Sequence, residues 1–151
     1  MINRAPTGFY QGNKGLRQGC PLSPLLFLIV SDGLSRLLLD AKSKGLLKGI
    51  QVTDGHCLTQ LLSMDDVLIF GCESFQEWRL YYDTIRTFCL ASRMEVNPTK
   101  SSFTIYGVEI DAQILHLFPY PVSHLDDGFT YLGFTLKPNC YGKMDWVWLL
   151  D

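Results

Sequence analysis

Two adjacent acids between two short apolar runs are the feature that most constrains how this chain can fold. Asp65 and Asp66 lie between Cys57–Leu62 and Val67–Phe70, with no basic residue beside them. Both runs are short and partly β-branched, which is typical of buried strands. The segment therefore predicts a β-hairpin whose tip is formed by Met64, Asp65 and Asp66.

The chemistry of this pair leaves two interpretations open. Two carboxylates about 4 Å apart repel each other by about 1 kcal/mol in water and by about 4 kcal/mol at an effective dielectric constant of about 20. A fold that keeps both acids commonly places a cation between them, and Mg²⁺ prefers such oxygen ligands. An ordinary hairpin turn also accommodates aspartate, which tolerates unusual backbone angles. The other motifs of the chain bear on this choice.

Composition and charge favour a globular protein of a reducing compartment. Of the 151 residues, 47% are hydrophobic and 19% are charged, which favours one packed domain over a disordered chain. A formal net charge of −2 is unfavourable for an independent nucleic-acid-binding module. The five cysteines are widely spaced without a Cys-x-x-Cys pair, which argues against a zinc cage or a disulfide framework.

Signals for export or membrane insertion are not visible in the sequence. Met1–Arg4 leads to no apolar core of a signal peptide, and the longest apolar run, Leu25–Val30, is far too short to span a bilayer. We therefore expect an intracellular protein, nuclear or cytoplasmic, that is neither secreted nor bound to a membrane.

A first long helix is predicted over residues 25–45. Ser23 followed by Pro24 is typical of a helix start with Ser23 as the N-cap, and Gly45 is typical of a helix end. Apolar residues recur on one face at three- and four-residue steps, and this predicted core face comprises Leu26, Ile29, Val30, Gly33, Leu34, Leu37, Leu38 and Ala41. Ser31, Asp32 and Ser35 lie on the opposite face.

A second helix is predicted over residues 74–92. A capping box at Ser74–Glu77 opens it, and it must end before Asn97-Pro98 because the residue ahead of proline avoids helical angles. Its apolar stripe is mainly aromatic and comprises Trp78, Tyr81, Tyr82, Ile85, Phe88 and Cys89. Packing into the core is the main interpretation of this stripe, and a platform for stacked bases is the alternative.

Short β-branched or aromatic segments predict the remaining strands. These are Lys48–Thr53, which turns at Asp54-Gly55, and later Ser102–Tyr106, Ile114–Phe118 and Phe129–Leu136. Together with the hairpin over 57–71, they predict an α+β fold in which two main helices pack on one face of a small antiparallel sheet.

Four motifs follow one another along the chain. Arg-Gln-Gly-x-Pro-Leu-Ser-Pro at 17–24 opens the first helix, and the Asp pair follows in its hairpin. An Asn-Pro-x-Lys-Ser turn at 97–101 comes after the second helix, and Tyr-Leu-Gly-Phe stands at 131–134. In this order the motifs resemble the reverse transcriptase of LINE-type (non-LTR) retrotransposons, from the second palm motif to the start of the thumb. The likeness covers nearly the whole chain, and Gly15–Pro24 is its most specific part.

The resemblance implies an RNA-directed DNA polymerase, a nucleotidyltransferase that uses an RNA template, a DNA primer and deoxynucleoside triphosphates. Asp65 and Asp66 would be catalytic metal ligands, which join another Asp from earlier in the chain to hold two Mg²⁺ ions. Lys100 matches a lysine near the leaving pyrophosphate and would be a proton donor. Without the motif, Lys100 would be an ordinary surface charge.

Two further groups of residues are implied to contact nucleic acid. The loop residues Arg17, Gln18, Gly19 and Pro21 would lie against the template base pair, where Gly19 permits close approach of the backbone. The alternative for Arg17 is a solvated loop charge. Tyr131, Leu132 and Gly133 resemble the primer-grip hairpin, and core packing explains these residues equally well.

The sequence departs from the family pattern in two ways. Ser63-Met64 stands where the family usually has an aromatic residue and alanine, and the loss of a large buried group there would cost about 2–4 kcal/mol if the site is in the core. The first palm motif, with its own metal-binding Asp, is not found in the chain and is expected before Met1, and the thumb is expected beyond Asp151.

We therefore expect an incomplete palm domain over residues 1–151 that is inactive by itself. It would bind Mg²⁺ only if the site is completed, and it would bind nucleic acid weakly or not at all. The alternatives are a non-catalytic RNA- or protein-binding module retained by the host, and a translated remnant without a selected role. The remnant would expose the apolar face that a missing strand should cover.

Overall fold

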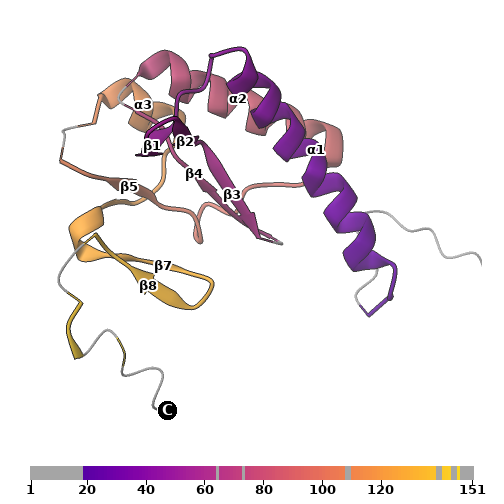
Figure 1. The fold of residues 1–151 in the computed structure, drawn as a ribbon. Coiled ribbons are helices and arrows are strands. Elements are labelled where there is room, and N and C mark those ends of the chain that lie inside the picture. Colours follow the sequence, from indigo (N-terminus) through magenta and orange to yellow (C-terminus); the bar gives the residue numbers. More distant parts are fainter. Residues whose placement is uncertain are drawn as a thin grey trace, which may run out of the picture.

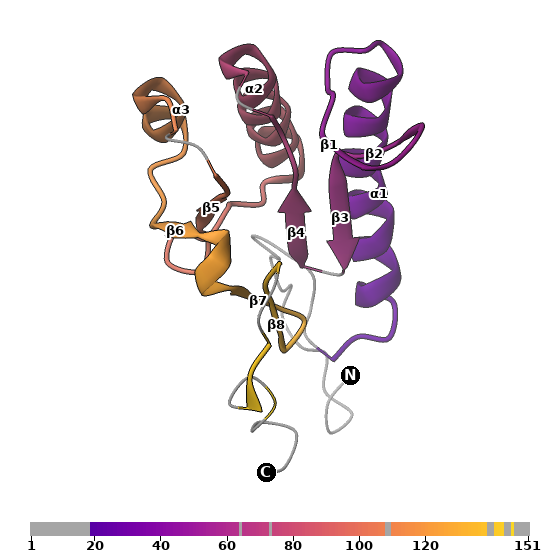
Figure 2. The same ribbon diagram turned by 60° about the vertical axis from the view of Figure 1, so that its left-hand side comes forward.

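The computed structural model describes residues 19–63, 65–72, 74–107, 110–138, 141–143 and 146. These residues have the α+β architecture that the sequence predicts, with three α-helices and short paired strands among them (Figure 1). The helices are α1 (Ser23–Ser43), α2 (Phe75–Ser92) and α3 (Ala112–Leu117). They lie side by side with α2 in the middle, and the strands β3, β4 and β5 run along one side of this helical layer (Figure 2).

Within the described part of the chain, the strands form four separate two-stranded ladders instead of one continuous sheet. The pairs are β1 (Ile50–Thr53) with β2 (His56–Leu58), β3 (Gln60–Ser63) with β4 (Asp66–Ile69), β5 (Phe103–Ile105) with β6 (Val122–His124), and β7 (Phe129–Tyr131) with β8 (Phe134–Leu136). Three pairs are antiparallel hairpins, as predicted, and β5 with β6 is parallel. A short 3₁₀ helix, η1 (Leu125–Asp127), follows β6.

The prediction of a strand over Ile114–Phe118 is wrong, because this segment lies mostly in helix α3. The side chain of Asp111 accepts the backbone N–H of Gln113 at 2.8 Å and so caps the helix. Ile114 and Phe118 are both buried and stand four residues apart, which places them on one side of a helical turn. Because α3 connects β5 to β6, the two strands can run parallel, which a tight hairpin does not allow.

The start of α1 also differs from the prediction. Ser23 is the first residue inside the helix and not its N-cap; Leu22 occupies the N-cap position without any side-chain cap. The predicted end is confirmed, since α1 stops at Ser43 and Gly45 adopts a left-handed φ of +70°.

The core lies where α1, α2 and α3 meet the strands, and aromatic rings fill much of it. Its buried apolar members are Leu34, Leu38, Ala41, Leu47, Tyr81, Phe103, Ile114 and Phe118. The ring of Trp78 lies 4.8 Å from that of Phe103 and 5.8 Å from that of Phe118, between centroids. These contacts confirm core packing as the role of the aromatic stripe on α2, in preference to a base-stacking platform.

Only part of the predicted core face of α1 is buried. Leu34, Leu38 and Ala41 are inside, whereas Ile29 is 69% exposed and Leu37 is 44% exposed. The N-terminal half of α1 extends beyond the end of α2 (Figure 2), which leaves Ile29 uncovered by that helix.

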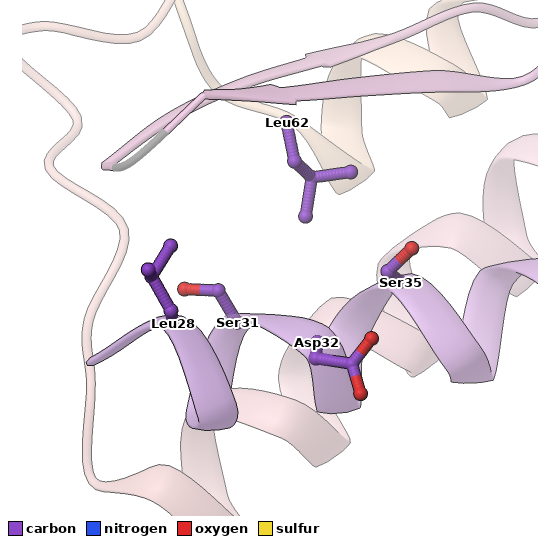
Figure 3. Close-up of a pocket in the computed structure, with 5 residues that line it drawn as sticks. All are labelled: Leu28, Ser31, Asp32, Ser35 and Leu62. Atoms are coloured by element: carbon purple, nitrogen blue, oxygen red, sulfur yellow. The ribbon is translucent and has the colours of Figure 1, made fainter. Parts of the chain in front are cut away.

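The prediction that Ser31 and Ser35 lie opposite the core face is wrong. Both are half-buried and lie on the side of α1 that is turned toward Leu62 of β3 (Figure 3). Periodicity therefore identified some of the buried positions, but the neighbouring strand and helix decided which side of α1 is covered.

Candidate active site

The predicted hairpin around the two acids is present. Strands β3 and β4 pair in register from Gln60 opposite Ile69 to Ser63 opposite Asp66. Asp65 lies in the turn, and Asp66 is already the first residue of β4. We call residues 60–69 the acidic hairpin.

The register of the strands determines which way Asp66 faces. Leu62 points from β3 toward Ser31, Ser35 and Leu28 of α1 (Figure 3). Successive residues of a strand alternate between its faces, and directly opposed residues share a face. Ser63 and its partner Asp66 therefore lie on the face of the acidic hairpin that is turned away from α1.

Both carboxylates are available to a cation. Asp65 and Asp66 are exposed, and among the described residues neither takes part in an ion pair. Mg²⁺ is usually held by one or two carboxylates together with water and substrate phosphates, so this donor set fits part of a Mg²⁺ site. No group of three or more His, Cys, Asp or Glu residues that could hold a metal occurs among the residues described.

Two other acidic sites invite comparison with the acidic hairpin: Asp32, which lies close to it on α1, and the second Asp-Asp pair at 126–127. Asp32 borders a shallow depression of about 170 Å³ between α1 and Leu62 (Figure 3), but its carboxylate accepts a hydrogen bond from Arg36 Nε at 2.6 Å. Asp126 and Asp127 are a second pair of adjacent exposed acids, and they lie in η1. Adjacency of two aspartates in the sequence therefore does not by itself predict a strand hairpin.

A buried tyrosine, Tyr81, contacts the base of the acidic hairpin. The sequence predicted that Tyr81 is in the core but did not predict its hydrogen bond. The hydroxyl of Tyr81, on α2, lies 2.8 Å from the carbonyl oxygen of Phe70 and 3.3 Å from that of Thr59. The N–H of Phe70 donates to the same Thr59 carbonyl at 2.9 Å. Burial raises the pKa of Tyr81 well above its ordinary value, and the nearby Glu77 and Cys72 add to this effect.

Glu77 is a buried acid whose role sequence reasoning missed. Its side chain is 3% exposed, and Oε1 accepts the backbone N–H groups of Lys48 and Gly49, each at 2.8 Å. Oε2 accepts the N–H of Cys72 at 3.2 Å. In the predicted capping box, Glu77 would bond back to the start of its own helix; instead it ties two distant segments to α2. Glu77 stands four residues before Tyr81 and therefore lies on the same face of α2, and this spacing was the sequence signal that could have predicted its burial.

Half of that capping box is present. The side chain of Ser74 accepts the backbone N–H of Glu77 at 3.4 Å, so Ser74 is the N-cap of α2. At the other end, Arg93 adopts a left-handed φ of +58° and the helix ends before Asn97, as predicted.

Lys100 lies in a compact turn after α2. The side chain of Asn97 accepts the N–H of Thr99 at 3.0 Å, and the N–H of Lys100 donates to the Asn97 carbonyl at 3.2 Å. The Lys100 side chain is exposed, and in the described part of the chain no ion pair joins it to Asp65 or Asp66.

The template-side loop is described only in part. Arg17 and Gln18 lie outside the described residues. Gly19 is exposed with a left-handed φ of +82°, and Pro21 is exposed just before α1. The positive φ at Gly19 explains why glycine suits this position.

The segment that resembles a primer grip is a tight hairpin. Tyr131 of β7 pairs with Phe134 of β8, and the turn between them has φ of +51° at Leu132 and +83° at Gly133. Two successive positive φ values are typical of a type I′ turn, whose twist matches that of the flanking strands. Tyr131 is half-buried, whereas Leu132 is 50% exposed.

The candidate site segments are only loosely grouped. The tip of the acidic hairpin, the start of α1 and the β7–β8 hairpin lie in the lower half of Figure 2, but in Figure 1 the start of α1 and the β7–β8 hairpin lie on opposite sides of the acidic hairpin. Among the described site residues, no hydrogen bond or ion pair joins these segments. None of the helices described combines the length and hydropathy needed to cross a membrane.

An exposed acidic hairpin that packs against helices on one face characterises this α+β domain. Residues 1–136 match the family of reverse transcriptases (RNA-dependent DNA polymerases), which covers most of the chain. The chain belongs to the reverse transcriptase family. It is also similar to an uncharacterized mitochondrial protein of Arabidopsis thaliana, AtMg01250, with 43% identity over 91 residues, or 58% of this chain and 75% of that protein.

Proposed function

We propose that this chain is a palm segment of an RNA-directed DNA polymerase of the LINE-type (non-LTR) retrotransposon class, and that it does not synthesise DNA by itself. The observation that carries this proposal is the acidic hairpin, which leaves Asp65 and Asp66 exposed and without an ion-pair partner among the described residues. The LINE-type assignment rests on the order of the motifs at 17–24, 65–66, 97–101 and 131–134.

In this proposal the two aspartates bind the metal that the reaction requires. Mg²⁺, when bound, lowers the pKa of the primer 3′-hydroxyl and neutralises the developing charge on the phosphates. The tight turn keeps the two carboxylates next to each other, so they can share one coordination shell. The exposed Lys100 would supply a proton or a positive charge to the leaving pyrophosphate.

The contacts with nucleic acid are assigned to the two flanking segments. Gly19 and Pro21, with Arg17 and Gln18 before them, would approach the template base pair. Tyr131, Leu132 and Gly133 would support the primer end. In support of this assignment, Gly19 and Leu132 are both exposed and therefore accessible to a nucleic acid.

We infer that a further acidic residue completes the site. A two-metal site needs more protein oxygen ligands than two adjacent aspartates offer. We therefore expect that the isolated chain binds divalent cations weakly and extends no primer. Primer extension on an RNA template with Mg²⁺ and deoxynucleoside triphosphates tests this expectation. Template-dependent incorporation that disappears in Asp65→Ala would contradict the proposed inactivity, while it would support the assigned role of Asp65.

Metal binding by the isolated chain provides the sharper test. Mn²⁺ should broaden the nuclear magnetic resonance signals of the acidic hairpin, and Asp65→Ala should remove this broadening. The double variant Asp126→Ala/Asp127→Ala is the matched control, because it removes an equally exposed acid pair from η1. Broadening that centres on η1, or that survives Asp65→Ala unchanged, would refute the assignment of the metal site.

A further inference from the structure

The acidic hairpin is attached to the rest of the molecule at its base, and helix α2 makes the attachment. Thr59 and Phe70 flank the paired strands and are joined by the 2.9 Å bond from the Phe70 N–H to the Thr59 carbonyl. The hydroxyl of Tyr81 closes this base from the side of the helix, 2.8 Å from the Phe70 carbonyl. A phenol has one proton to donate, so the shorter contact with Phe70 is the main hydrogen bond.

Glu77 extends the same attachment by one helical turn. Its carboxylate accepts the N–H of Cys72, two residues beyond Phe70, and the N–H of Gly49. The backbone of Gly49 packs closely against the residue that precedes Thr59, since a Cβ at position 49 would lie only 2.1 Å from the Leu58 carbonyl oxygen. The chain entering β3 and the chain leaving β4 are therefore both fixed to α2.

The geometry makes the tip sensitive to this base. Asp66 is four positions along the chain from Phe70, which corresponds to about 13 Å along an antiparallel strand. A rotation of about 10° at the base would move the tip by about 2 Å, whereas metal ligands must be held within about 0.5 Å. Phenylalanine at position 81 would fill the same space, so packing alone does not require the hydroxyl.

We propose that Tyr81 and Glu77 are positioning residues that fix the base of the acidic hairpin and thereby set the direction in which Asp65 and Asp66 meet a divalent cation. This inference rests on the proposed function, in which those two acids are metal ligands. It assigns to α2 a task beyond its contribution to the core.

The variant Tyr81→Phe tests the hydroxyl in the full chain. Tyr82→Phe is the matched control, because Tyr82 is the next residue of α2 and its ring packs edge-on against Phe118 at 5.8 Å. Backbone amide exchange in the acidic hairpin and Mn²⁺-induced broadening of its signals are measured under conditions where both variants are fully folded. We expect Tyr81→Phe to accelerate hairpin exchange about fivefold and to weaken Mn²⁺ binding about threefold or more, the size of effect that loss of one hydrogen bond produces. Tyr82→Phe should leave both within about twofold of the unmodified chain.

The variant Glu77→Gln tests the second contact without removing the side chain. Its amide oxygen can still accept the N–H groups of Lys48 and Gly49, but its NH₂ group would face the N–H of Cys72. We expect faster exchange at Cys72 and weaker Mn²⁺ binding, with a smaller effect than that of Glu77→Ala.

The outcomes separate the inference from the proposed function. Faster hairpin exchange in Tyr81→Phe with unchanged Mn²⁺ affinity of the folded chain would overturn the inference, because it would show a structural role alone. Unchanged exchange and unchanged affinity would overturn it as well. If the unmodified chain shows no broadening that depends on Asp65, the proposed function fails, and the proposed positioning of metal ligands fails with it. The exchange data would still establish whether the Tyr81 hydroxyl stabilises the hairpin.

Discussion

Gly49 is the described glycine whose replacement by alanine this fold should tolerate least. Its φ is +65°, and a Cβ there would lie 2.1 Å from the Leu58 carbonyl oxygen and 2.7 Å from the Leu58 carbonyl carbon. Both neighbours are backbone atoms, which cannot rotate away. We expect Gly49→Ala to lower the free energy of unfolding by at least about 2 kcal/mol, measured by urea denaturation.

Gly55 offers a control that separates backbone conformation from steric overlap. It has a φ of +82°, but nothing lies within 4 Å of the position of its Cβ. Gly55→Ala should therefore cost only the conformational term, about 1 kcal/mol. Equal losses in the two variants would contradict the close packing of Gly49 against Leu58.

The buried phenol of Tyr81 predicts a loss of stability at alkaline pH. Burial raises its pKa in the folded chain above the ordinary value of about 10 for an unfolded tyrosine. The unfolded state therefore releases this proton first, and the stabilising contribution, complete below about pH 10, is lost as the pH rises toward the folded pKa. For one tyrosine the slope approaches about 1.4 kcal/mol per pH unit.

The measurement is urea denaturation at several pH values between about 9 and 11. Tyr81→Phe should flatten this pH dependence, although it is less stable at neutral pH because the hydrogen bond to Phe70 is lost. Tyr106, which is 61% exposed, provides the comparison variant Tyr106→Phe. If the slope in Tyr81→Phe equals that of the unmodified chain, the raised pKa of Tyr81 is refuted.

Among the elements, the β7–β8 hairpin combines good local geometry with an unfavourable turn residue. A type I′ turn requires positive φ at both central positions, and Leu132 adopts +51° although it carries a Cβ. Asparagine tolerates this conformation, so Leu132→Asn should raise the free energy of unfolding by about 0.5–1 kcal/mol. Leu90→Asn is the control, because Leu90 is 73% exposed on helix α2. This substitution removes a similar apolar surface but relieves no positive φ. A lower stability of Leu132→Asn would show that the leucine makes a contact that outweighs the strain.

The acidic hairpin and α2 form the element pair on which the proposed function depends. The strands supply the turn that carries Asp65 and Asp66, and α2 supplies Tyr81 and Glu77 at the opposite end of the hairpin. The hydrophobic periodicity of α2 predicted its buried stripe correctly. It did not reveal that one buried position, Glu77, is an acid satisfied by three backbone N–H groups.

Taken as a whole, the molecule leaves a large apolar area of α1 uncovered among the described residues. Leu25, Leu28 and Ile29 are each more than half exposed on its N-terminal half. Contiguous apolar surface of this kind promotes association. We expect the purified chain to self-associate as its concentration rises and the double variant Leu25→Lys/Ile29→Lys to reduce this association, as measured by sedimentation velocity.

Stability of the same variants provides the control for that expectation. Because both side chains are exposed, the double substitution should change the free energy of unfolding by less than about 1 kcal/mol. Leu38→Lys, at a position that is fully buried, should instead prevent stable folding. Unfolding of Leu25→Lys/Ile29→Lys would show that these side chains are covered in solution.

What could be predicted from the sequence alone was local. The hairpin at Asp65 and Asp66, the end of α1 near Gly45 and the capped start of α2 at Ser74 follow from periodicity, turn chemistry and capping, which act over a few neighbouring residues. The order of the motifs similarly indicated the reverse transcriptase family, which the match over residues 1–136 confirms. These features do not depend on what lies elsewhere in the fold.

The tertiary structure decided everything that depends on distant partners. Ile114–Phe118 carries an apolar run that suits a strand or a helix, and burial of Ile114 and Phe118 against the core, in addition to the local cap at Asp111, selected the helix. Glu77 is buried because N–H groups from 28, 29 and 5 residues away meet its carboxylate. Much of the predicted apolar face of α1 is exposed because β3 packs on the side of the helix that carries Ser31 and Ser35, and because α2 ends before α1 does. Short-range interactions thus select the elements of this chain, whereas the available neighbours select which side chains are buried and where the hairpin points.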